Sequence, residues 1–259
     1  MVRAHSAAYH AIHEIQPQAM VGLAHYYRGM EPAKTWSPFD RWVTRIRNRI
    51  FNEIFPGAVH DGRIRIFGRT IRIPEAVRTQ DYFGLDYYTS EIVRFDPFRP
   101  KELFGRGDFA EDAVLSGTGF IMNAPDGFWK ALTFAHSFQL PVIILENGVE
   151  DASDRMRPRY LAQHIRKVWE AVNFNWDIRG YFYWTLVDNF EWERGWTQRF
   201  GLWDLDVETQ ERRKRPSADF YREICEENSL SSEMVAKYAP EIFEEMFPGK
   251  GPGELSPPR

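Results

Sequence analysis

The chain has 259 residues, of which 43% are hydrophobic and 15% aromatic, so it is long enough for one large domain or two small ones. Its formal net charge is −4 with both signs interspersed, which argues against a nucleic-acid-binding or membrane-surface protein. The single cysteine, Cys225, excludes an internal disulfide framework and a cysteine-rich metal site.

The first residues predict a helix rather than a signal peptide. Apolar residues recur at roughly helical spacing over residues 3–16 and do not form a continuous apolar core. No apolar run of 18 residues occurs in the sequence, so no membrane span is expected. We therefore expect a cytoplasmic protein.

Short apolar runs then alternate with helical patterns. The runs predict strands at 19–24, 82–89, 141–145 and 180–186. Proline or a capping serine predicts helix starts at Ser37-Pro38, Pro125, Arg157-Pro158 and Ser217. A basic, hairpin-like stretch spans 63–69, and a loop rich in Gly, Pro and Phe is predicted over about 91–122. The alternation predicts an α/β fold with a parallel sheet and crossover helices.

Residues 229–259 have a different pattern and are predicted to be a C-terminal extension of the unit at 1–228. Apolar residues from Val235 to Met246 repeat at helical spacing, which predicts one amphipathic helix. The last residues, GKGPGELSPPR, are rich in Gly and Pro, and we expect them to be disordered.

Polar or aromatic residues follow each predicted strand. These clusters are His25-Tyr26-Tyr27, Asp86-Tyr87-Tyr88, Glu146-Asn147 and the stretch from Trp184 to Trp192. Because ligands of α/β barrels and open sheets lie at the C-terminal ends of the strands, the clusters predict one shared cleft. Glu146 follows the run VIIL, which we expect to be buried on both faces, so its carboxylate would be mounted on a rigid strand.

The stretch YWTLVDNFEWERGW suits a sugar, because it places Asp188 and Glu191 among three tryptophans. A carboxylate accepts hydrogen bonds from adjacent hydroxyls, while an indole stacks on the C–H face of a pyranose. Beside it, a glutamate at a strand end suits attack on an anomeric carbon. Taken alone, Glu146 has a second interpretation as a solvated loop residue.

Several of these motifs resemble glycoside hydrolase family 1, the retaining β-glucosidases and β-glycosidases. ILENG is similar to the family's nucleophile motif, usually (I/V)TENG, and FGLDYYTS is similar to its GLNYYT segment. GYFYWTLVDNFEWERGWTQRFGLWDLD resembles its final-strand signature, and RMRPRYLAQHI and RPSADFYREI also fit. The resemblance covers residues 1 to about 228, in order, and implies a (β/α)8 barrel.

The resemblance also implies a role for each matching residue. Glu146 would be the nucleophile, with Tyr88 donating a hydrogen bond that orients it. Trp184 would form the floor under the sugar ring, and Glu191, with Trp192 beside it, would bind the distal sugar hydroxyls.

Four further positions lie near this implied site. Phe200 would close the pocket near C6 of the sugar, and Phe120 stands where an aglycone-side tryptophan is frequent. Leu145 replaces the usual threonine. Asp86 replaces the usual asparagine and adds a negative charge near Glu146, so Asp86 either weakens the nucleophile or is itself protonated.

The resemblance covers only the second half of a barrel, equivalent to strands five to eight. A retaining glycosidase needs a second carboxylate about 5–5.5 Å from the nucleophile, and the family's Asn-Glu-Pro motif that supplies it does not occur in this sequence. Half a barrel has two unpaired edges and an uncovered inner face. We therefore expect an N-terminal half-barrel chain as partner, self-association or rearranged packing. A truncated gene product is equally compatible with the sequence.

The predicted function is retaining hydrolysis of β-glycosides or oligosaccharides, weak in the isolated chain. An unphosphorylated terminal sugar is expected because Glu191 would repel a 6-phosphate. The alternative is a non-catalytic sugar-binding or interaction protein derived from a truncated glycosidase. Neither function requires a cofactor or a metal.

Overall fold

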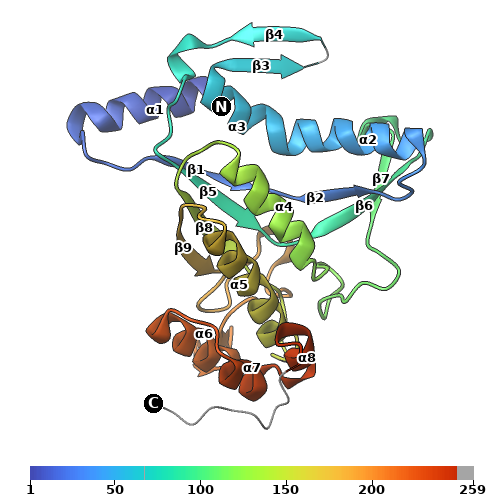
Figure 1. Ribbon diagram of the computed structural model, residues 1–259, viewed down its shortest axis with the longest axis vertical. Coiled ribbons are helices and arrows are strands. Elements are labelled where there is room, and N and C mark those ends of the chain that lie inside the picture. The colour runs from blue at the N-terminus through green and yellow to red at the C-terminus, as the bar shows by residue number, and fades with distance from the viewer. Residues whose placement is uncertain (67, 250–259) are drawn as a thin grey trace.

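The computed structural model describes residues 1–66 and 68–249, and the four predicted strands form one sheet in it (Figure 1). The sheet consists, in spatial order, of β1 (Gly22–Tyr26), β5 (Tyr82–Tyr87), β8 (Val142–Asn147) and β9 (Ile178–Tyr183). Each strand pairs in parallel with the next. The predicted parallel α/β sheet is therefore confirmed, with strand boundaries that differ by two or three residues at β1 and β9.

Helices precede, connect and follow these strands. They are α1 (Val2–Ile15), α2 (Pro38–Asn48), the π-helical η1 (Arg49–Glu53), α3 (Ile54–Asp61), α4 (Pro125–His136), α5 (Arg157–Asn173) and α6 (Pro216–Glu227). Ser37 caps α2 as predicted, because its hydroxyl accepts the amide of Asp40 at 3.2 Å. Ser217 does not cap α6. Its own amide donates instead to the Asp154 carboxylate at 2.8 Å, so the first turn is satisfied by a residue distant in sequence.

A second sheet occupies part of the segment for which a loop is predicted. Strand β6 (Ser90–Phe95) pairs in parallel with β2 (Gly29–Pro32) and in antiparallel fashion with β7 (Gly105–Asp108). The loop prediction is wrong for these residues, because β6 finds its partner in β2, far away in the sequence. The predicted basic hairpin is present as β3 (Arg63–Ile66) and β4 (Arg69–Arg72), and β10 (Trp203–Leu205) pairs with β11 (Arg212–Lys214). Short 3-10 turns lie at Pro74–Ala76, Pro100–Glu102 and Trp192–Arg194.

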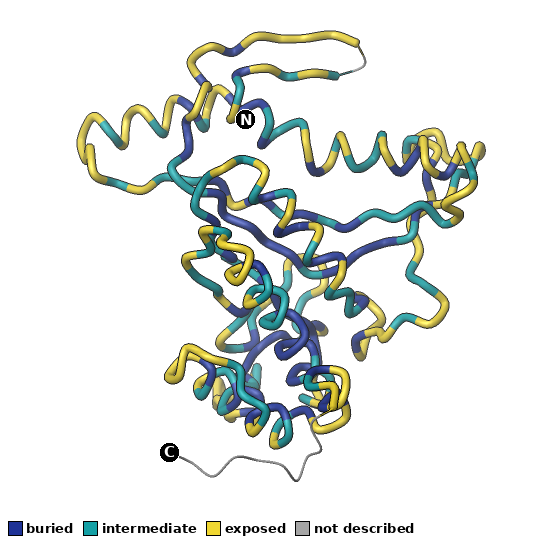
Figure 2. The backbone as a smooth tube through the Cα atoms, viewed as in Figure 1, coloured by how far each residue is buried: buried dark blue, intermediate teal, exposed yellow. Residues whose placement is uncertain are grey.

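The outer face of the four-stranded sheet is sealed by helices. Phe83 and Leu85 of β5 and Ile144 of β8 are 0% exposed and pack against Phe128 and Leu132 of α4. Buried backbone is concentrated in these strands and under α4 and α5 (Figure 2). This face holds one of the main hydrophobic cores of the chain.

The inner face is not covered. Ile143 and Leu145 of β8 are only half-buried, and Phe182 of β9 is 58% exposed. The expectation that the VIIL run is buried on both faces is therefore wrong, because side chains alternate along a strand and only one side meets helices. Within the described residues, β1 and β9 each pair with one strand only, so the two unpaired edges expected for half a barrel are present.

The C-terminal extension packs onto the rest of the chain. It forms α7 (Ser232–Tyr238), a 3-10 turn (Pro240–Ile242) and α8 (Phe243–Met246), whereas one continuous helix was predicted. Pro240 separates them, because proline lacks the amide that a helix interior needs. Val235 and Phe243 share a core with Leu161 of α5 and Phe220 of α6. The tail expected to be disordered, 250–259, lies outside the described residues.

None of the helices in 1–66 or 68–249 combines the length and the hydrophobicity that a membrane span requires.

Candidate active site

Glu146 lies at the C-terminal end of β8, next to the end of β5. A bulge follows Leu85, so that Leu85 pairs with Ile144 while Asp86 pairs with Glu146. The phenol of Tyr88, just beyond β5, donates a hydrogen bond to Oε2 of Glu146 at 2.7 Å. Burial, and then this hydrogen bond, raise the pKa of Tyr88 well above its usual value, so the phenol stays protonated and remains a donor.

Asn147 anchors the backbone around this pair. It is fully buried, and its amide nitrogen donates to the Tyr160 hydroxyl at 3.0 Å, which in turn donates to the carbonyl of Tyr88 at 2.9 Å. The Tyr181 hydroxyl donates to Oδ1 of Asn147 at 2.7 Å. From the sequence, Asn147 is expected only as a member of the strand-end cluster Glu146-Asn147. Its position directly after Glu146 is the signal that could have identified it.

Asp86 lies beside Glu146 and is 7% exposed. Its Oδ1 accepts no hydrogen bond from the part of the chain that the structure describes. Burial, and second the charge of Glu146, raise the pKa of Asp86 to about 7. Ionisation of Asp86 beside Glu146 is therefore disfavoured below about pH 7.

An indole and a carboxylate form the neighbouring part of the site. The Trp184 Nε1–H donates to Oε1 of Glu191 at 3.3 Å, and the amide of Asn189 donates to the same oxygen at 2.7 Å. Asn189 was not singled out from the sequence. Trp184 and Tyr88 both pack against the buried cluster that contains Phe200, and the Phe200 ring meets the Tyr88 ring edge-on at 5.9 Å between centroids. This cluster thus lies between the Tyr88–Glu146 pair and the Trp184–Glu191 pair.

Two of the residues expected at the site lie at its exposed margin. Trp192 is 81% exposed, and it makes no ring contact with another described residue. Phe120 is 43% exposed and lies under the guanidinium of Arg194, 4.8 Å from the ring centroid. Their roles in sugar binding remain predictions.

Asp188 does not belong to the sugar-binding set suggested for it by the sequence. It is 3% exposed and pairs with Arg215 at 3.0 Å and with Arg199 at 3.6 Å. Its Oδ1 also accepts the amide of Gly201 at 2.7 Å. Buried carboxylates need such partners, so Asp188 is bound within the fold and stabilises the segment that follows Trp184.

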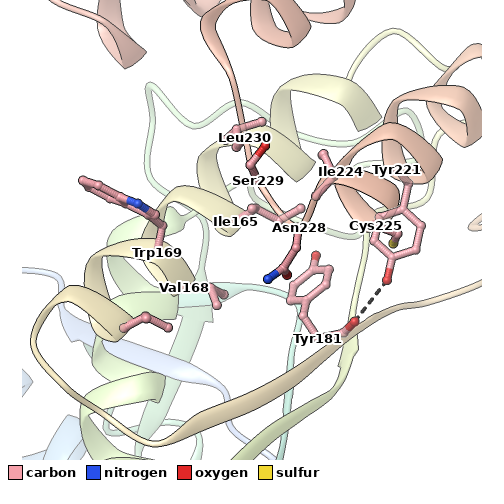
Figure 3. A pocket seen from close by; sticks show the side chains of 11 residues that line it. Ile165, Val168, Trp169, Tyr181, Tyr221, Ile224, Cys225, Asn228, Ser229 and Leu230 are labelled. Atoms are coloured by element: carbon pink, nitrogen blue, oxygen red, sulfur yellow. Dashed lines mark hydrogen bonds between the residues drawn. The ribbon is translucent and has the colours of Figure 1, made fainter. Parts of the chain in front are cut away.

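A separate pocket of about 290 Å³ lies between α5, α6 and β9 (Figure 3). Apolar side chains such as Ile165, Val168 and Leu230 line it, and the Tyr221 hydroxyl donates to the carbonyl of Tyr181 at 3.0 Å. No carboxylate is among its lining residues, so it lacks the group that attack on an anomeric carbon requires.

Residues 1–230 match the model of the family described as glycosyl hydrolase family 1. The β-galactosidase of Sulfolobus acidocaldarius is 33% identical over 245 residues, which cover 90% of this chain and 48% of the relative. β-Glucosidase A of Thermotoga maritima is 34% identical over 162 residues, covering 58% of this chain and 35% of the relative. The solved β-glycosidase from Pyrococcus horikoshii aligns with a TM-score of 0.82 at 32% identity, covering 92% of this chain and 54% of that chain.

The chain therefore spans about half the length of the curated relatives that it matches over most of its own length. Its four parallel strands with crossover helices correspond to about half of the (β/α)8 barrel of the structural neighbours.

Proposed function

Because this chain belongs to glycosyl hydrolase family 1, we propose that it takes part in retaining hydrolysis of β-glycosides with Glu146 as the nucleophile. The observation that carries the proposal is the 2.7 Å hydrogen bond from Tyr88 to Glu146 at adjacent strand ends. It orients one carboxylate on a rigid sheet, where the C-terminal ends of parallel strands meet.

In the proposed reaction a carboxylate oxygen of Glu146 attacks the anomeric carbon. The bond from that carbon to the aglycone oxygen breaks, and its electron pair leaves with the aglycone. Water then cleaves the glycosyl ester and frees Glu146. Tyr88 holds Oε2, so Oε1 is the oxygen we assign to the attack.

Trp184 and Glu191 are proposed to bind the terminal sugar. The indole offers a flat face for the C–H side of the ring. Oε1 of Glu191 already accepts two hydrogen bonds, which fixes the carboxylate while Oε2 is left for sugar hydroxyls. No described Lys, Arg or His forms an ion pair with Glu191, so a phosphorylated sugar would meet an uncompensated negative charge.

The proton for the leaving aglycone would come from a carboxylic acid outside these 259 residues. A retaining mechanism requires a second carboxylate about 5–5.5 Å from the first. We propose an N-terminal half-barrel chain of this family, which would pair with the free edges of β1 and β9, cover the inner face and supply the Asn-Glu-Pro glutamate. A second copy of this chain would cover the edges without supplying that motif.

A 2-fluoro glucoside with a dinitrophenol leaving group tests the nucleophile, since this leaving group departs without an acid. We expect a covalent mass adduct on the peptide that contains Glu146. Glu146→Gln should form none, and the exposed Glu208→Gln should label as the parent does. Glucose binding without any adduct would support the non-catalytic sugar-binding protein instead.

The Glu146→Gln chain should unfold at the same urea concentration as the parent or a higher one, because a charge beside Asp86 is removed.

With Glu146→Ala, azide should restore turnover of the activated glucoside and yield the α-glycosyl azide, because the anion occupies the vacated position. A β-configured product would show that Glu146 is not the attacking group.

A further inference from the structure

We propose that Asp86 and Glu146 form a coupled carboxyl pair in which Asp86 holds a proton, and that esterification of Glu146 releases this proton. The inference rests on the proposed role of Glu146 as nucleophile. Asp86 is a positioning residue here, because it acts on the substrate only through the charge of Glu146.

The sheet register places the two side chains together. Asp86 and Glu146 are direct partners on β5 and β8, and neighbouring strands lie about 4.8 Å apart. On its other flank Asp86 pairs with Tyr26 of β1. Asp86 is thus enclosed between two strands and is 7% exposed, with Oδ1 unpartnered among the described residues.

No cation compensates this pair in the described ranges. The groups that face Asp86 are Glu146 on β8, Tyr26 on β1 and, from its own strand end, the Tyr88 phenol, which is bonded to Glu146. Arg28 lies beyond Tyr26 and pairs with Glu91 at 3.3 Å. Asp86 is buried and Glu146 is partly buried. Two such adjacent carboxylates without a cation are costly to ionise together, so the pair retains one proton.

Asp86 is the member of the pair that carries the proton. Its own burial, and then the charge of Glu146, raise the pKa of Asp86 to about 7, whereas Glu146 receives the Tyr88 hydrogen bond that favours a carboxylate. Forming the glycosyl ester neutralises Glu146 and removes the second of these causes. The pKa of Asp86 then falls, and at near-neutral pH its proton passes to solvent. By linkage, ester formation becomes more favourable as pH rises through this titration.

The reagent 2-fluoroglucosyl fluoride measures this proton directly. An ester bond forms between Glu146 and the anomeric carbon while the C–F bond breaks to release fluoride, so the substitution alone neither takes up nor releases a proton. In weak buffer near pH 6.5, we expect release of roughly half a proton per adduct, for a coupling of about one pH unit. Asp86→Asn has the same shape and no titrating proton, and it should form the adduct with no release. Adduct formation without release from the parent chain, or equal release from Asp86→Asn, overturns the proposal.

The absence of any adduct would refute the proposed function, and the coupling is then decided on the unlabelled chain. Between about pH 4 and pH 7 the folded chain keeps a proton that unfolded Asp86 has lost, so the contribution of Asp86 to the parent's unfolding free energy should fall as pH rises. Asp86→Asn should lack this fall, and in Glu146→Gln the fall should end at a lower pH. If a variant does not fold, carboxyl-carbon NMR of the unsubstituted chain measures the titration of Asp86 instead. Parallel stability curves for the parent and Asp86→Asn overturn the coupled pair.

Discussion

The two faces of the four-stranded sheet carry similar apolar residues but differ in what covers them. Ile144 of β8 is 0% exposed under α4, whereas its neighbour Ile143 is half-buried and Phe182 of β9 is 58% exposed on the opposite side. The outer face therefore stabilises this half of a barrel. The inner face remains available for the site and for a partner.

The largest expected effect is an increase in turnover when an N-terminal half-barrel covers the inner face. The isolated chain should hydrolyse cellobiose very weakly, because its sequence has no Asn-Glu-Pro glutamate to act as the general acid. Adding an N-terminal half of a family 1 glycosidase that carries Asn-Glu-Pro should increase turnover by roughly 10²–10⁴-fold, the usual contribution of general acid catalysis.

Steady-state cellobiose hydrolysis at increasing partner concentration measures this gain. The same N-terminal half with the Asn-Glu-Pro glutamate replaced by glutamine should associate without raising turnover. Rapid cellobiose hydrolysis by the purified chain alone would contradict the missing-acid interpretation.

A smaller effect is expected on stability. Truncating a side chain on the outer face should lower the free energy of unfolding more than truncating one on the inner face. Ile144→Ala removes a fully buried side chain and should lower the free energy of unfolding by roughly 2–5 kcal/mol. Ile143→Ala is the matched control on the same strand and should cost about 1 kcal/mol, because Ile143 is already partly solvated. Urea unfolding of both variants measures the difference, and equal losses would show that the inner face is covered in solution.

The smallest expected effect is a difference in pH dependence between the faces. His25 packs against Phe83 and Phe134 on the outer face, and burial lowers the pKa of His25 to about 4. Its unfolded pKa is about 6.5, so the unfolded chain binds a proton that the folded chain excludes, and stability falls as pH drops below about 6.5. This slope is opposite in sign to that expected from Asp86 on the inner face.

His25→Gln removes the titrating imidazole. Relative to the parent, its unfolding free energy should rise by about 1 kcal/mol from pH 6 to pH 5. Chemical denaturation at the two pH values measures this change, and identical pH profiles would place the acid sensitivity in another residue.

The features that depend on local pattern could be predicted from the sequence. Alternating apolar runs and helical segments were sufficient to predict four strands with crossover helices, and the strand-end motifs singled out Glu146 and Tyr88. The hydrogen bond between these two residues could be anticipated, because consecutive parallel strands bring their C-terminal ends to one edge of the sheet. The hydrogen bond of the Ser217 amide could not be anticipated, because its acceptor, Asp154, lies in a distant segment of the chain.

Long-range packing determines which groups are covered and which are paired, and the sequence does not show it. Asp188 resembles a sugar ligand in sequence, yet Arg215 and Arg199 reach it in the fold and neutralise it. Strand β6 lies in a stretch with a loop-like composition. It could not be predicted because its partner, β2, lies far away in the chain. The VIIL run shows the same limit, since local apolarity predicts a strand but helix packing determines which of its faces is removed from water.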